Sequence, residues 1–132
     1  MPDMTSPLHI PVVEVSLPRP LRAVTDGLTI WLHDRLSHRE RRVALAHEYC
    51  HAWLGHTTHQ PKHVELEIDL AVARWLLPDL DAVVDALAAA DMNVDVAADD
   101  LAVTPRTLRL RLENLLGYEE RHVEQRFQDF FP

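Results

Sequence analysis

Two histidines and a glutamate occur in this sequence at a spacing that suits metal-dependent hydrolysis. The run His47-Glu48-Tyr49-Cys50-His51 has the pattern H-E-x-x-H. Residues four apart on a helix lie one above the other, so both imidazole rings can reach one metal ion. Glu48 would then lie beside the ion, where its carboxylate can take a proton from a metal-bound water and pass it to a leaving amine. The motif predicts a catalytic metal site with Glu48 as the general base.

A third protein ligand is needed, because catalytic zinc usually takes three side chains and keeps the fourth position for water. The segment after the motif offers Glu65, Glu67 and Asp69. At about 100° per residue, Glu65 and Asp69 share the helix face of Val72 and Leu76, whereas Glu67 points to the solvated side. Two carboxylates on an enclosed face need a compensating charge. We therefore predict Glu65 as the third ligand and Asp69 as the acceptor that orients a histidine ligand, with Glu67 as the alternative ligand.

The donor set predicts Zn²⁺ as the cofactor, with manganese and iron as open alternatives. His47 and His51 share a helical stripe with Val43, Cys50 and Leu54, so they are expected on the buried side of the helix. His56 follows shortly after the motif and is a candidate to line the site or to contact the substrate.

The helix that must carry the motif is predicted independently by the residues at its two ends. Ser37 and Glu40 fit a capping box, and Gly55 suits the position just after a helix. A helix is therefore expected over about residues 38–54.

Short β-prone runs precede this helix. Residues 21–25 and 28–33 flank Asp26-Gly27, which predicts a hairpin with a type I′ turn and positive φ at both central positions. A further short strand is expected around the valines at 12, 13 and 15. The fold class is therefore α+β, with a small N-terminal sheet packed on a helical core and a mostly helical C-terminal half.

The rest of the chain is expected to be helical. The predicted segments are 63–77, 79–91, two helices within 94–116 in a helix-turn-helix-like arrangement, and a last amphipathic helix after residue 117. Thr104 should cap the second helix of the pair, with Pro105 as its first residue, and Gly117 should end it.

The sequence predicts three structural parts in the chain. Residues 1–20, rich in proline, form an extended arm, residues 21–92 form the metallopeptidase core, and residues 93–132 form a C-terminal helical segment packed on that core.

The composition indicates the cellular compartment and the kinds of partner that are expected for this protein. The chain has 132 residues, enough for a core without disulfides, and a single cysteine, which suits a reducing compartment. No secretory signal and no membrane-spanning apolar run is recognisable, so the protein is expected to be soluble and cytoplasmic. The formal net charge of −8 disfavours strong nucleic-acid binding.

Three segments of the sequence resemble the ImmA/IrrE family of metallo-endopeptidases over roughly residues 20–116. They are RRVALAHEYCHAWLGH, ELEIDLAVARWLLP and VAADDLAVTPRTLRLRLENL. The resemblance implies metal ligands at His47, His51 and Glu65 and a catalytic glutamate at Glu48. It also implies a zinc-dependent protease that acts on helix-turn-helix repressors of phages, mobile elements or stress regulons.

Two other functions compete with this one. A non-catalytic zinc module that binds a repressor would use the same ligands but would not need Glu48. A DNA-binding role is suggested by Arg106, Arg109 and Arg111 in the helix-turn-helix-like segment. The acidic residues around those arginines favour instead helices that pack on the peptidase core.

Overall fold

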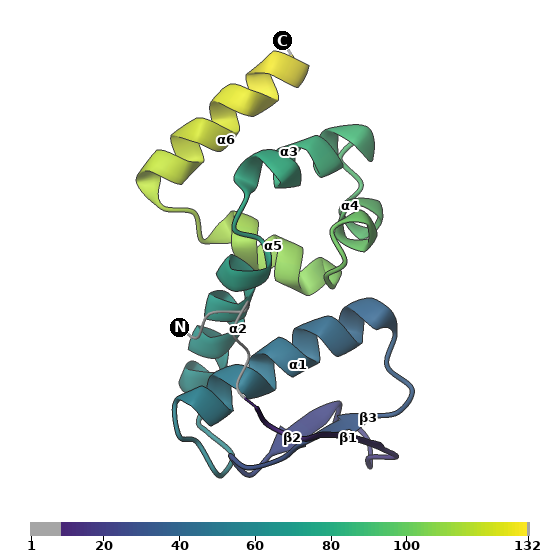
Figure 1. Ribbon diagram of the computed structural model, residues 1–132. Coiled ribbons are helices and arrows are strands. Elements are labelled where there is room, and N and C mark those ends of the chain that lie inside the picture. Colours follow the sequence, from purple (N-terminus) through teal and green to yellow (C-terminus); the bar gives the residue numbers. More distant parts are fainter. Residues whose placement is uncertain (1–8, 132) are drawn as a thin grey trace.

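The computed structural model describes residues 9–131 and shows a small sheet followed by six helices in that range (Figure 1). The strands are β1 (Val12–Val15), β2 (Ala23–Thr25) and β3 (Ile30–His33). The helices are α1 (His38–Trp53), α2 (Lys62–Leu76), α3 (Leu80–Ala89), α4 (Val94–Asp100), α5 (Pro105–Glu113) and α6 (Gly117–Phe130). This confirms the predicted α+β class. In the described range, no helix is both long enough and apolar enough to cross a membrane.

The sheet has the order β1-β3-β2, so β3 is central and β2 is an edge strand. β3 pairs in parallel with β1 and antiparallel with β2. Ile30 and Leu32 of β3 are fully buried, which fits alternation of side chains across a half-covered sheet. Figure 1 shows α1 lying across one face of the sheet, so that the sheet supports the motif helix.

The hairpin between β2 and β3 is confirmed, but the predicted type I′ turn is wrong. Four residues, 26–29, separate the strands, and within them a positive φ of 90° occurs at Gly27 and not at Asp26. The Asp26 carboxylate accepts hydrogen bonds of 2.9 Å from the backbone N–H groups of both Leu28 and Thr29. These side-chain bonds stabilise a longer loop, which is why an Asp-Gly pair alone did not define the turn.

The motif helix α1 begins where its cap predicts. The Ser37 hydroxyl accepts from the Glu40 N–H, and the Glu40 carboxylate accepts from the Ser37 N–H, each at 3.2 Å. The helix ends at Trp53, followed by Leu54 as its cap and Gly55 with a φ of 77°. Leu54 was expected on the buried stripe, but it is 50% exposed because it lies beyond the last helical turn.

Helix α2 connects the sheet-bearing part of the molecule to the remaining helices, and α6 lies at the end farthest from the sheet (Figure 1). α2 packs against both α1 and α5, while α3 packs against α4 and α6. One buried apolar cluster joins all of α1 to α5, with Cys50, Val72, Leu87 and Leu108 among its members. α5 is therefore part of the same core that holds the motif helix.

The boundary between α5 and α6 differs from the prediction. Thr104 caps α5 and Pro105 is its first residue, as expected, but the helix ends at Glu113 rather than at Gly117. Gly117 instead begins α6, because the Leu116 N–H donates a 3.0 Å hydrogen bond to the Glu119 carboxylate and so fixes a new helix start.

Buried Arg111 links these two helices to the end of α2. Its Nε donates to the Leu77 carbonyl at 2.9 Å and its Nη2 to the Glu119 carboxylate at 2.8 Å. Arg111 is only 3% exposed, so its side chain serves packing and cannot contact DNA.

Candidate metal centre

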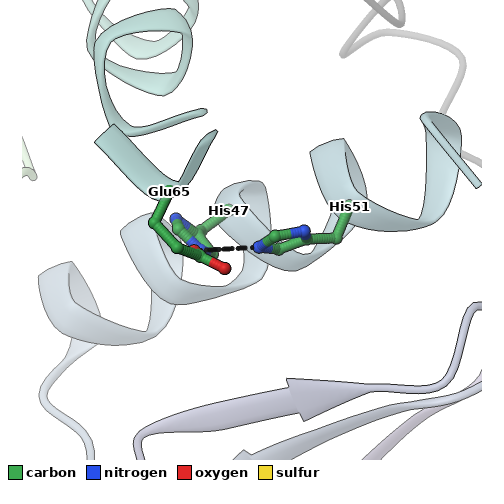
Figure 2. A group of neighbouring side chains, drawn as sticks. All are labelled: His47, His51 and Glu65. Carbon is green, nitrogen blue, oxygen red and sulfur yellow. Dashed lines mark hydrogen bonds and ion pairs between the residues drawn. The ribbon is translucent and has the colours of Figure 1, made fainter. Parts of the chain in front are cut away.

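Three potential metal ligands meet where α2 crosses α1. His47 and His51 lie one turn apart on α1, and Glu65 lies in the first turn of α2. Figure 2 shows the Glu65 carboxylate reaching across to the two imidazole rings. These residues form the one cluster of three potential metal-binding side chains found among residues 9–131.

The donor atoms form a compact triangle. Oε2 of Glu65 is 2.8 Å from Nε2 of His47 and 3.0 Å from Nε2 of His51, and the two Nε2 atoms are 3.1 Å apart. His51 is 6% exposed, whereas His47 and Glu65 are partly accessible. The triangle is therefore enclosed on the His51 side and open on the other.

The far nitrogen of each imidazole ring is held by a further side chain. Nδ1 of His47 lies 2.8 Å from Oδ1 of Asp69, and since an ionised carboxylate only accepts, Nδ1 carries the hydrogen. Nδ1 of His51 lies 3.0 Å from Nδ1 of His56. A hydrogen on Nδ1 leaves Nε2 of a neutral ring with a free lone pair, directed at the shared point.

The triangle fits a divalent cation. Two imidazole lone pairs and a carboxylate oxygen that face one point repel each other. A proton shared between two of these atoms still leaves the third atom without a positive partner. Ligand atoms around a tetrahedral ion, each about 2.0–2.1 Å from it, lie about 3.3–3.4 Å apart. The three observed edges of 2.8–3.1 Å need to lengthen only by a few tenths of an ångström to reach that spacing.

The pKa values of the two histidines in the cluster are shifted in opposite directions. Burial disfavours charge on both rings, but at His47 the hydrogen bond and charge of Asp69, with the charges of Glu48 and Glu65, outweigh it and raise the pKa. At His51 burial dominates and the pKa is lowered. The pKa values of Glu65 and Asp69 are both lowered, because their hydrogen bonds to the histidines and, for Asp69, to Arg106 exceed the effect of burial.

Glu48 lies beside the cluster rather than in it. It is 8% exposed, and burial raises its pKa to about 7, an effect that the charge of Glu65 strengthens and that of His47 opposes. A carboxyl group that titrates near neutral pH is suited to accept and return a proton.

A cleft of about 770 Å³ opens beside this carboxylate. Its walls come from four parts of the chain: residues 20–23, which lead into β2, the cap and the cleft-facing side of α1, Asp69 of α2, and the cap and the cleft-facing side of α5. His47, Glu48 and Asp69 lie in its lining. A peptide in the cleft would therefore pass next to the candidate general base.

The remaining two candidates, Glu67 and His56, contribute no donor atom to the triangle. Glu67 is exposed on the opposite side of α2 and is not part of the cluster. His56 lies behind His51, where it contacts the ring and does not line the cleft.

One contact at the site was missed from the sequence. Nη1 of Arg106 on α5 donates a 2.7 Å hydrogen bond to Oδ2 of Asp69. The two residues are 37 positions apart. No local pattern connects them, because the contact depends on how α5 packs against α2.

A small sheet packed on a helix that presents two histidines and a glutamate, with a carboxylate from the next helix facing them, is the arrangement expected of a metallopeptidase-type domain. The model of the IrrE N-terminal-like domain, Peptidase_M78, matches residues 16–128, and the chain belongs to this family. The match confirms the resemblance to the ImmA/IrrE proteins and extends it into α6, as far as residue 128. No curated protein and no solved structure gives a significant match.

Proposed function

We propose that this protein is a zinc-dependent metallo-endopeptidase. The observation that carries the proposal is the convergence of Nε2 of His47, Nε2 of His51 and Oε2 of Glu65 on one point, with Glu48 beside it at the edge of a cleft. The membership of a peptidase family supports the same function. Zinc suits two nitrogens and one carboxylate oxygen better than magnesium or calcium, which prefer all-oxygen sites.

In this proposal His47, His51 and Glu65 hold the ion, and Asp69 and His56 fix the orientation of the two rings. A zinc ion bound there would act as a Lewis acid, polarising the peptide carbonyl and lowering the pKa of a water molecule so that nucleophilic hydroxide is available near neutral pH. Glu48 accepts the proton of the attacking water and donates it to the nitrogen of the leaving amine. The burial of Glu48 raises its pKa to about 7, which suits a carboxyl group that both accepts and donates this proton.

The endopeptidase assignment follows the ImmA/IrrE resemblance, and the cleft offers room for a polypeptide on one side of the reacting bond. It continues past the His47–Glu48 end in the direction of Arg39 and the start of β2. A peptide lying in it can extend away from the reacting bond instead of ending there. The proposed substrate is a helix-turn-helix transcriptional repressor of a phage, mobile element or stress regulon, the class that the ImmA/IrrE resemblance implies. Such a substrate places the activity in the cytoplasm.

Metal content and proteolysis, measured on the same preparations, test this function. The wild-type chain should bind zinc in a one-to-one ratio, and His47→Ala and Glu65→Ala should lose it, whereas Glu67→Ala should keep it. Glu48→Gln should keep the zinc and lose proteolysis of a helix-turn-helix repressor by about 10²-fold or more. Undiminished cleavage by Glu48→Gln would exclude this mechanism, and zinc binding that depends on Glu67 instead of Glu65 would exclude this ligand set.

A further inference from the structure

The cleft beside the donor triangle is lined with positive charge, although the whole protein is acidic. The chain has a formal charge of −8 and 13 lysines and arginines. Four of these 13 residues line the cleft: Arg22, Arg39, Arg106 and Arg109. They come from both walls, two from the side of β2 and the start of α1 and two from α5. Against the three carboxylates of the same lining, Glu40, Glu48 and Asp69, this leaves an excess of one formal positive charge in the cleft, whereas the whole chain carries a net negative charge.

Two of these arginines form no ion pair with a carboxylate of the described residues. Nη1 of Arg39 donates to the backbone carbonyl of Asp95, at 3.5 Å, and among residues 9–131 Arg39 forms no ion pair, although its charge helps to lower the pKa of Glu40. Arg109 is exposed on α5 and forms no ion pair with another residue in the 9–131 range. Arg106 is engaged by Asp69, and Arg22 is 3.9 Å from Glu40. Arg39 and Arg109 are therefore the guanidinium groups available to a bound ligand.

Two of the three carboxylates among the described lining residues, Glu48 and Asp69, lie at the donor-triangle end of the cleft. The third, Glu40, lies near Arg22 and Arg39, and the positive charges of these two arginines oppose its negative charge. A ligand with carboxylates near Arg39 and Arg109, and a neutral segment near Glu48, would match this distribution of charge. Guanidinium groups bind carboxylates through paired hydrogen bonds, which favours such a ligand further.

We propose that the cleft selects an acidic segment of a protein substrate, with Arg39 and Arg109 as the residues that determine this specificity. This inference rests on the proposed peptidase function and names its substrate class. A nucleic acid fits less well, because it carries a phosphate at every nucleotide and would bring charge against Glu40, Glu48 and Asp69. A polypeptide can leave those positions neutral.

Peptide binding to the full-length Glu48→Gln protein, which should not cut the probe, tests the inference. The probes are a fluorescein-labelled peptide of alternating glutamate and glycine, its glutamine counterpart, and an oligothymidylate. At low ionic strength the glutamate peptide should bind about three- to thirtyfold more tightly than the glutamine peptide, the range expected for two partly exposed ion pairs. Added salt should reduce that ratio.

Matched variants in the same background locate the effect. Arg39→Gln/Arg109→Gln should bring the two peptides to equal affinity, whereas Arg121→Gln, an exposed arginine of α6 outside the cleft, should leave the preference intact. Arg109→Glu alone should reduce the preference and serves if the double variant does not fold. Equal binding of the two peptides by the parent protein would overturn the inference, as would tighter binding of the oligothymidylate that depends on Arg39 and Arg109.

The two proposals fail separately in these experiments. Acid-selective binding without any Glu48-dependent cleavage would overturn the peptidase function and leave the cleft assignment standing. Cleavage of substrates with no selective binding of the glutamate peptide would overturn only the cleft assignment.

Discussion

Arg106 on α5 donates a 2.7 Å hydrogen bond to Asp69 on α2, and the other oxygen of the same carboxylate accepts from His47 on α1. One side chain thus connects the C-terminal helices to a candidate metal ligand. The buried cluster that spans α1 to α5 holds the three helices in this arrangement. The position of the His47 ring therefore depends on helices that lie far from the motif in the sequence.

Replacement of Asp69 should weaken metal binding without removing a ligand. In Asp69→Ala the His47 ring loses the acceptor that fixes its tautomer and orientation, and the zinc dissociation constant should rise about 10- to 100-fold. Competition with a fluorescent chelator measures this change. Glu67→Ala, which removes an exposed carboxylate from the same helix, is the matched control and should bind zinc as the wild type does.

Replacement of Arg106 should have a smaller effect of the same kind. The guanidinium is 60% exposed, so its ion pair with Asp69 is screened by solvent, and Arg106→Gln should weaken zinc binding by about two- to fivefold. If Arg106 acts through Asp69, the double variant Arg106→Gln/Asp69→Ala should match Asp69→Ala alone. Additive losses in the double variant would show that Arg106 acts by another route.

These contacts show what could and could not be predicted from the sequence. The cap at Ser37 and Glu40 located the motif helix, and the helical periodicity placed Glu65 and Asp69 on one face, because both signals come from residues a few positions apart. The contacts of Arg106 with Asp69 and of His56 with His51 depend on tertiary packing or loop conformation. The predictions of a type I′ turn at Asp26-Gly27 and of a helix end at Gly117 were wrong for a related reason. In both places a side-chain carboxylate, that of Asp26 or of Glu119, accepts hydrogen bonds from nearby backbone N–H groups and so determines the local backbone conformation.

The Arg111–Glu119 pair predicts a specific acid sensitivity. The hydrogen bond from Arg111, with a backbone hydrogen bond from Leu116, lowers the pKa of Glu119 from 4.5 to about 2, against the effect of burial. A carboxyl group whose pKa is lower in the folded state stabilises the fold fully above its unfolded pKa, and this contribution is lost as the pH falls towards the folded value. The stabilisation by Glu119 should therefore fade between about pH 4.5 and pH 2.

Urea denaturation of Glu119→Gln as a function of pH measures this contribution. At pH 7 the variant should lose about 3 kcal/mol of unfolding free energy, because buried Arg111 keeps its charge without a carboxylate partner. The difference from the wild type should shrink as the pH falls below about 4.5. Glu120→Gln, at the exposed neighbouring position, should follow the wild-type curve throughout. A constant difference at every pH would rule out this role for Glu119.

Truncation of Leu108 tests whether α5 and the motif helix unfold together. Leu108 is fully buried in the cluster that also contains Cys50 of α1, and Leu108→Ala should cost about 2–5 kcal/mol. Leu116→Ala removes a side chain that is 48% exposed and should cost much less. Far-ultraviolet circular dichroism and the fluorescence of the three tryptophans, Trp31, Trp53 and Trp75, should report one common transition for Leu108→Ala. Two separate transitions would mean that α5 can melt while α1 stays folded.

Metal binding should stabilise the folded chain, because the three donor atoms come from two different helices. His47 and His51 come from α1 and Glu65 from α2, so the triangle exists only while these helices are docked. An ion held by all three acts as a cross-link, and each tenfold excess of free ion over its dissociation constant adds about 1.4 kcal/mol to the stability of the folded chain. Chelation would then lower the melting temperature of the protein as well as its activity, so heat resistance itself would report how much metal the chain has acquired.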